Sequence, residues 1–142
     1  MIVLDTNIIS ELSKPHCSAA VLAWLNAQEV RTLYLTTVNL AELMAGVALL
    51  DDGRRKEALR SGLLAVIDRL FGTRILPFDA PAARRYGELV GVCRRKGISV
   101  SMADALIAAI AMEHGFSVAT RDVTPFRAAG VEVIEPWTYP GQ

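Results

Sequence analysis

Short apolar runs alternate along this chain with longer segments in which apolar residues recur every three or four positions. Polar or turn residues bound each short run, and the runs are rich in β-branched and large apolar residues, which is typical of strands buried on both faces. The longer segments have the spacing of amphipathic helices. The pattern predicts five strands, at residues 2–5, 33–37, 74–78, 116–120 and 131–136.

Residue types that begin and end helices mark the longer segments. Ser or Asp precedes three of them, and Gly follows three. The predicted helices cover residues 18–29, 54–72, 79–97 and 101–115, with shorter ones from residue 8 and around NLAELMAG at 39–46. Strands that alternate with helices in this way predict an α/β protein with a mainly parallel, five-stranded sheet and helices on both of its faces.

The length of 142 residues and the 52% hydrophobic composition predict one domain, over residues 1–142, with a well-filled core. Cys17 and Cys93 are isolated, which favours reduced thiols in a cytoplasmic protein. The chain lacks a signal-peptide pattern, and acids interrupt both long apolar segments, so no membrane association is expected. Lys plus Arg equals Asp plus Glu at 15 each, so net charge does not indicate a nucleic-acid partner.

Four carboxylates fall where a parallel α/β sheet binds its ligands, beyond the carboxyl ends of strands and at the starts of helices. Asp5 ends the first strand, and Glu42 lies a few residues past the second. Asp104 begins the helix that follows Ser101, and Asp122 follows the fourth strand. The topology therefore predicts that these four side chains meet at one edge of the sheet.

Each of these acids also fits a purely structural role. Two of them stand three residues after Asn39 and Ser101, which is the spacing of a capping box. Asp5 or Asn7 has the position of a cap for the short helix from residue 8, and Asp122 that of the first residue of an Asx-turn. Taken one at a time, the acids are explained as well by caps and turns as by chemistry.

The neighbours of Glu42 and Asp104 favour a metal site instead. Both are set among apolar residues that are expected to pack inward, and a partly buried carboxylate needs a cation, hydrogen bonds or a proton. Arg121 is the only basic residue next to any of the four acids in the sequence. Because converging carboxylates repel one another, a divalent cation is the expected counter-charge, and oxygen ligands favour Mg²⁺ or Mn²⁺.

The segments MIVLDTNIISEL, TTVNLAELMAGV, SMADALIAAIA and VATRD, in this order, closely resemble PIN-domain ribonucleases. Within that family they look most like the VapC/FitB-type toxins of bacterial toxin–antitoxin pairs. The resemblance covers essentially the whole chain, including ILPFD and the EPW near its end. It implies a three-layer α/β/α fold and a metal-dependent endoribonuclease activity that leaves a 5′-phosphate and a 3′-hydroxyl.

The resemblance also implies roles for the four acids around Mg²⁺ or Mn²⁺. Asp5 and Asp104 are expected to bind the principal ion directly. Glu42 and Asp122 are expected to bind through water, to orient the attacking water or to hold a second ion.

Three further residues complete the site that the resemblance implies. Asn7 and Thr120 match residues that support the family's acid cluster, and Arg121 is the candidate phosphate contact. Aromatic residues make up only 6% of the chain, so no aromatic platform for stacking bases is expected.

The partners implied by the resemblance are an RNA substrate, a second copy of the chain in a homodimer, and a small antitoxin. The antitoxin's N-terminal part would bind operator DNA, and its C-terminal segment would cover the toxin's active-site groove. The alternative to an enzyme is a binding module, either a catalytically inert PIN domain or a receiver-like domain. A receiver needs an acid pair after the first strand and a Lys after the fifth, and this chain has neither.

Overall fold

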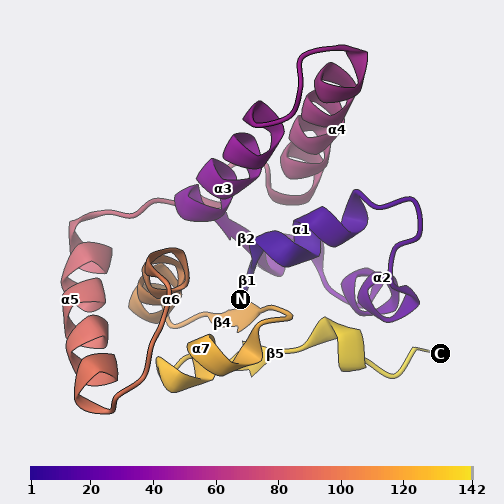
Figure 1. The fold of residues 1–142 in the computed structure, drawn as a ribbon. Helices are drawn as coiled ribbons and strands as arrows, with labels where there is room; N and C mark the ends of the chain where they lie inside the picture. Colours follow the sequence, from indigo (N-terminus) through magenta and orange to yellow (C-terminus); the bar gives the residue numbers. More distant parts are fainter. Residues whose placement is uncertain (142) are drawn as a thin grey trace.

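The computed structural model describes residues 1–141, and its centre is a five-stranded sheet in which every pair of neighbouring strands is parallel (Figure 1). The strand order is β3-β2-β1-β4-β5. The strands are β1 (Ile2–Leu4), β2 (Leu33–Thr36), β3 (Ile75–Leu76), β4 (Ser117–Ala119) and β5 (Val133–Ile134). The predicted sheet is confirmed, although each strand is shorter than its apolar run because the end residues enter helix caps and loops.

The helices are α1 (Thr6–Leu12), α2 (Ala19–Asn26), α3 (Thr37–Ala48), α4 (Arg54–Phe71), α5 (Ala80–Arg95), α6 (Met102–His114) and α7 (Val123–Ala128), with 3-10 turns η1 (Val30–Thr32) and η2 (Pro136–Thr138). The predicted stop of α6 at Gly115 is confirmed, since this glycine has the left-handed values φ 69° and ψ 31°. α7 and both 3-10 turns were not predicted. No helix within residues 1–141 is long and apolar enough to cross a membrane.

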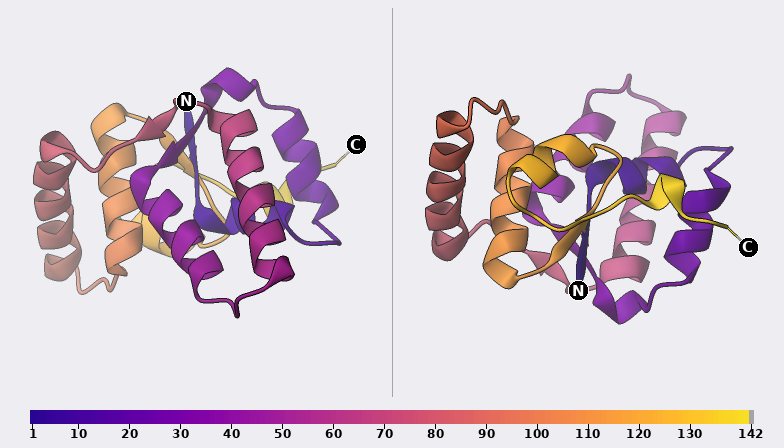
Figure 2. Two further views of the ribbon diagram at one scale, coloured as in Figure 1. Left: turned by 90° about the horizontal axis from the view of Figure 1, so that it is seen from above. Right: turned by 90° about the horizontal axis from the view of Figure 1, so that it is seen from below.

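Alternate residues of the central strands divide the molecule into three layers. Leu4 and Ala119 pack with buried residues of α1, α2, α3 and α4. Val3 and Val118, their neighbours on β1 and β4, pack with buried residues of α5, α6 and α7. Because side chains alternate across a strand, each central strand supplies both cores. Figure 2 shows α5 and α6 on one side and α2, α3 and α4 on the other.

The strand order reverses beside β1. From β1 the chain adds β2 and then β3 on one side, and it returns to place β4 and β5 on the other. The carboxyl ends of β1 and β4 therefore flank the point where the crossovers diverge, which is where open α/β sheets bind ligands. Asp5 and Thr120 are the first residues after these two strands.

Arg74 joins the edge of the sheet to α4. Its guanidinium donates to the carbonyl oxygens of Leu33 at 2.9 Å, Val30 at 3.1 Å and Leu70 at 2.6 Å. Because these are charge-assisted bonds to three separate segments, Arg74→Met is expected to lower the free energy of unfolding by about 2 kcal/mol in urea titrations. Arg69→Met, at an exposed position of α4, is the matched control. An equal loss of stability in both variants would contradict the stabilising role of the Arg74 hydrogen bonds.

Candidate active site

A pocket of about 330 Å³ lies beyond the carboxyl ends of β1 and β4, and the four acids singled out from the sequence all line it. They come from four places in the chain, namely the end of β1, α3, the start of α6 and the loop after β4. The predicted residues in its lining are Asp5, Asn7, Glu42, Asp104, Arg121 and Asp122. The prediction that these side chains meet at one edge of the sheet is confirmed.

Asp5 is the most enclosed of the four acids, with 5% of its surface exposed. Its Oδ1 accepts from the Thr6 N–H at 2.8 Å and from Asn39 Nδ2 at 3.4 Å. Its Oδ2 accepts from the Thr120 hydroxyl at 2.7 Å and from Asn7 Nδ2 at 3.3 Å. Asp5 is also the N-cap of α1, which begins at residue 6 rather than residue 8. The carboxylate therefore caps a helix and faces the pocket at once.

Burial raises the pKa of the Asp5 carboxyl from its ordinary value of 3.8 to about 6. The hydrogen bonds from Thr120 and Thr6 act in the opposite direction, and the negative charges of Asp104 and Glu42 raise the pKa further. Asp5 is thus largely ionised at neutral pH among neutral donors and like charges. A cation in the pocket would stabilise this arrangement.

Asp104 lies in the first turn of α6 and is half-buried. Its N–H donates to the Ser101 hydroxyl at 3.2 Å, which confirms Ser101 as the cap of this helix. Burial raises the pKa of Asp104, the hydrogen bond with Ser101 lowers it, and the charge of Asp122 raises it. Asp104 therefore lies at a helix start, and its pKa is raised, like that of Asp5, by burial and by a neighbouring negative charge.

Glu42 differs from its prediction in two respects. Its side chain is exposed rather than packed inward, and it accepts from the Thr6 hydroxyl at 2.9 Å. The capping box of α3 is formed by Thr36 and Asn39, not by Asn39 and Glu42, because the helix begins at Thr37. Asn39 is fully buried, and its Nδ2 reaches both Asp5 and the Thr6 hydroxyl. Glu42 is thereby linked to Asp5 through two neutral side chains.

Thr120 organises the loop that follows β4. Its hydroxyl donates to Asp5 and accepts from Asn7 Nδ2 at 3.1 Å and from the Asp122 N–H at 3.0 Å. Asp122 is exposed and precedes α7 without a capping bond from its side chain, so the predicted turn-opening role is not observed. The Arg121 N–H donates to Asn7 Oδ1 at 3.3 Å. Asn7 and Thr120 thus hold both the loop and the Asp5 carboxylate.

The pocket also contains residues that the sequence did not single out, namely Thr6, Ser10, Glu11, Lys14 and Trp137. Lys14 is a second cation in this lining, although Arg121 is the only basic residue next to any of the four acids in the sequence. The Arg121 guanidinium lies 5.5 Å from the centre of the Trp137 ring, within cation–π range. The sequence did not single out Trp137, which η2 brings to the pocket.

The chemistry of the pocket fits a hard divalent cation. Its acidic and polar lining offers carboxylate and hydroxyl oxygens, without Cys or His among the residues described, and Mg²⁺ and Mn²⁺ prefer such ligands. Within residues 1–141, no three His, Cys, Asp or Glu side chains stand close enough together to hold a metal as they are placed. The four acids line one pocket without forming a ready ligand cluster.

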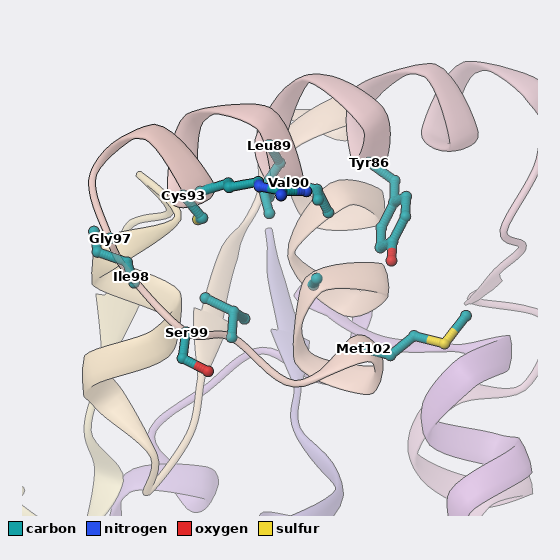
Figure 3. A pocket seen from close by; sticks show the side chains of 11 residues that line it. Tyr86, Leu89, Val90, Cys93, Gly97, Ile98, Ser99 and Met102 are labelled. Atoms are coloured by element: carbon teal, nitrogen blue, oxygen red, sulfur yellow. The ribbon is translucent and has the colours of Figure 1, made fainter.

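A second pocket, of about 480 Å³, lies between α5 and α6 and is lined mainly by apolar side chains (Figure 3). Tyr86 and Cys93 come from α5, and Met102 from the first turn of α6. Among residues 1–141 its lining includes one charged side chain, Arg94, and no carboxylate. The titratable groups described in its lining are the Tyr86 phenol, the Cys93 thiol and Arg94, with no cluster of carboxylates among them, so the acidic pocket is the candidate active site.

An all-parallel α/β sheet with carboxylates gathered at its switch point defines a class of proteins that bind a metal or a phosphate at the strand ends. The sequence profile of the PIN-domain family matches residues 2–131. The chain belongs to the PIN-domain family.

Several curated proteins are similar over nearly their whole length. Plasmid stability protein StbB of Pseudomonas syringae pv. tomato is 49% identical, over 96% of this chain and 99% of the relative. VapC ribonuclease Y4jK of Sinorhizobium fredii is 46% identical, over 96% and 98%. Toxin FitB of Neisseria gonorrhoeae is 44% identical, over 96% and 99%.

Solved structures give the same picture of the fold. The crystal structure of FitAcB from Neisseria gonorrhoeae matches with a TM-score of 0.92 and 43% identity, over 97% of this chain and 99% of that one. The structure of FitAB bound to an IR36 DNA fragment matches with a TM-score of 0.93 and 41% identity, over 100% and 99%. These likenesses agree with the three-layer α/β/α architecture.

Proposed function

We propose that this protein is a metal-dependent endoribonuclease that acts as the toxin of a toxin–antitoxin pair. The observation that carries the proposal is the buried Asp5 carboxylate, which faces Asp104 and Glu42 across a pocket at the switch point of the sheet. The names of relatives that are similar over their whole length, a VapC ribonuclease and the FitB toxin, support the reaction and its biological setting.

Asp5 and Asp104 would hold the principal Mg²⁺ or Mn²⁺, because they are the most enclosed of the four predicted acids and both have raised pKa values. When bound, the ion lowers the pKa of a water molecule and shields charge on the phosphoryl oxygens. Glu42 and Asp122 are more exposed and would orient the attacking water or bind through water. Arg121, at the rim, would contact a phosphate of the strand.

Thr120 and Asn7 both donate to the Asp5 carboxylate, and the bond from Thr120 lowers its pKa. Because the Thr120 hydroxyl is the strongest neutral contact that lowers the pKa of Asp5, Thr120→Val is expected to raise that pKa further and to weaken metal binding about tenfold or more. Cleavage measured against Mg²⁺ concentration checks this. Thr120→Ser retains the hydroxyl and is the control; Mg²⁺ curves that coincide for Thr120→Val and the wild type would remove Thr120 from the site.

The charge of the pocket also supports the proposed antitoxin. Five carboxylates and two cations line it, so a basic side chain from a partner would be attracted there as a metal ion would. A structure of FitAB with a DNA fragment is among those this chain resembles. We infer a small antitoxin that inserts an arginine among the acids and carries the operator-binding part, with the toxin as a cytoplasmic homodimer.

The test is incubation of purified, antitoxin-free protein with total RNA, with Mg²⁺, with Mn²⁺ and with EDTA, beside a matched DNA substrate. Cleavage of RNA that requires the metal and is inhibited by the co-expressed antitoxin is the expected result. Folded protein that leaves RNA intact under all three conditions would favour the alternative, a catalytically inert PIN domain or a receiver-like binding module.

A further inference from the structure

We propose that Lys14 binds a phosphate of the RNA strand beside the metal site, and that Glu11 is the residue that positions it. The inference rests on the proposed ribonuclease function and adds a residue for which the metal chemistry has no role. Three observations support it: the Glu11 carboxylate is buried, the Lys14 ammonium group lines the pocket, and the charges of Lys14 and Arg121 both act on Glu11.

Glu11 is a fixed anchor. It lies on the buried side of α1 and is 6% exposed. One carboxylate oxygen accepts from the Ser18 N–H at 2.9 Å, and the other accepts from Lys14 Nζ at 2.7 Å. The hydrogen bond from Lys14 and then that from Ser18 lower the pKa of Glu11, so it remains charged across the range in which the enzyme would work. The anchor therefore holds the start of α2 and the lysine together.

The Lys14 ammonium group is bonded to Glu11, and the side chain is also exposed to solvent. Its side chain is 54% exposed, whereas that of its partner is 7% exposed, and Lys14 lines the acidic pocket. An ammonium group has three N–H donors, and Glu11 occupies one of them. Lys14 lies two residues past the end of α1, and an ion pair whose cation is solvent-exposed contributes about 1 kcal/mol or less to stability. Stability alone is thus a weak reason to place a lysine at this wall.

The pocket separates its charges into two sets. Lys14 is bonded to Glu11, and the charge of Arg121 also acts on Glu11, whereas Asp104 and Glu42 act on Asp5. An RNA strand carries a negative charge at every phosphate, so it can present one phosphate to the acid side through a cation and a neighbouring one to the basic side.

Arg121 and Lys14 differ in how they are held. The Arg121 guanidinium lies over the Trp137 ring at 5.5 Å, and Lys14 is bonded to Glu11. Each cationic side chain is thus held by a neighbouring residue before RNA binds, so less side-chain entropy is lost when a phosphate binds. A phosphate contact depends on charge and not on the identity of the base, so Lys14 should strengthen the binding of all RNA sequences equally.

The experiment measures RNA binding and cleavage separately. Binding of a labelled 20-nucleotide RNA of mixed sequence is followed by anisotropy in Mg²⁺ at several KCl concentrations, with every variant placed in the Asp5→Asn chain so that the probe stays intact. Lys14→Ala is expected to weaken binding about five- to tenfold and to reduce the salt slope by about one. Lys14→Arg should bind within about twofold of its parent. In the otherwise wild-type chain, Lys14→Ala should raise KM more than it lowers kcat.

Two further variants test the role of Glu11 and the specificity of the effect. Glu11→Gln keeps the size and the acceptor for Ser18 but loses the charge that holds Lys14, so an intermediate loss of binding is expected. The double variant Glu11→Gln/Lys14→Ala should bind no more weakly than Lys14→Ala alone, because the two residues act as one unit. Lys96→Ala removes an exposed lysine at the end of α5 and should leave binding unchanged.

The outcomes distinguish this inference from the proposed function. If the wild type cleaves RNA but Lys14→Ala keeps its KM, affinity and salt slope, the assignment of Lys14 is overturned and the ribonuclease stands. Additive losses in the double variant would remove Glu11 as the positioning residue. If the wild type neither binds nor cleaves RNA, the proposed function fails and the phosphate contact fails with it.

Discussion

Asp5→Asn is expected to reduce Mg²⁺-dependent RNA cleavage about a thousandfold or more. The substitution removes the negative charge at the centre of the acid cluster and leaves the shape of the side chain intact. A metal ion supplies several kcal/mol of transition-state stabilisation, and each 1.4 kcal/mol changes a rate tenfold, so losing its principal ligand removes most of the rate. Initial rates on total RNA, with and without Mg²⁺, measure the effect.

The fold is expected to tolerate this substitution, which keeps the test interpretable. An asparagine oxygen still accepts from the Thr6 N–H, and its amide can donate to the Thr120 hydroxyl, which accepts as readily as it donates. Asp79→Asn is the matched control, because Asp79 also stands between a strand and a helix but caps α5 at the Ala82 N–H, 3.1 Å away. Wild-type cleavage by Asp5→Asn, with Mg²⁺ dependence retained, would exclude Asp5 as a ligand.

The fold could be predicted because most of its signals are local. Short runs of four to six residues and helix ends such as Ser18, Ser101 and Gly115 depend on near neighbours in the chain. The sheet order then brings the ends of β1 and β4 together, so acids that follow these strands share a pocket. Errors of one or two residues arose where a strand runs directly into a helix, as at Asp5 and Thr36.

The rest of the site depends on contacts between distant segments. Trp137 enters the pocket from η2, and no spacing in the sequence relates it to Arg121. The exposure of Glu42 follows from the capping box one turn earlier, where two helix-start patterns overlapped and the wrong one was chosen. The pair Glu11 and Lys14 did carry a signal, since opposite charges lie three residues apart at the end of α1, but such pairs are common on protein surfaces. Only its position at the pocket makes it informative.

Without divalent metal, the Asp5 carboxyl is expected to lower the stability of the wild type, relative to Asp5→Asn, as pH rises from about 4 to about 6. Asp5 has an ordinary pKa of 3.8 in the unfolded chain and about 6 in the folded one. Between these values the unfolded chain has lost a proton that the folded chain retains, so rising pH favours unfolding. Above pH 6 the full penalty of about 3 kcal/mol remains, and below pH 4 it is absent.

Melting curves in EDTA from pH 4 to pH 8, for the wild type and for Asp5→Asn, measure this penalty as a difference between the two proteins. The comparison cancels the contributions of other carboxylates, such as Glu11 and Asp52, whose lowered pKa values favour folding at higher pH. Relative to the variant, the wild type should lose about 8 °C in melting temperature across this range. Mg²⁺ at pH 7.5 should restore much of that loss in the wild type and leave Asp5→Asn unchanged, because an ion that binds only the folded state stabilises it. Parallel melting profiles with no response to Mg²⁺ would mean that Asp5 carries neither the buried charge nor the metal.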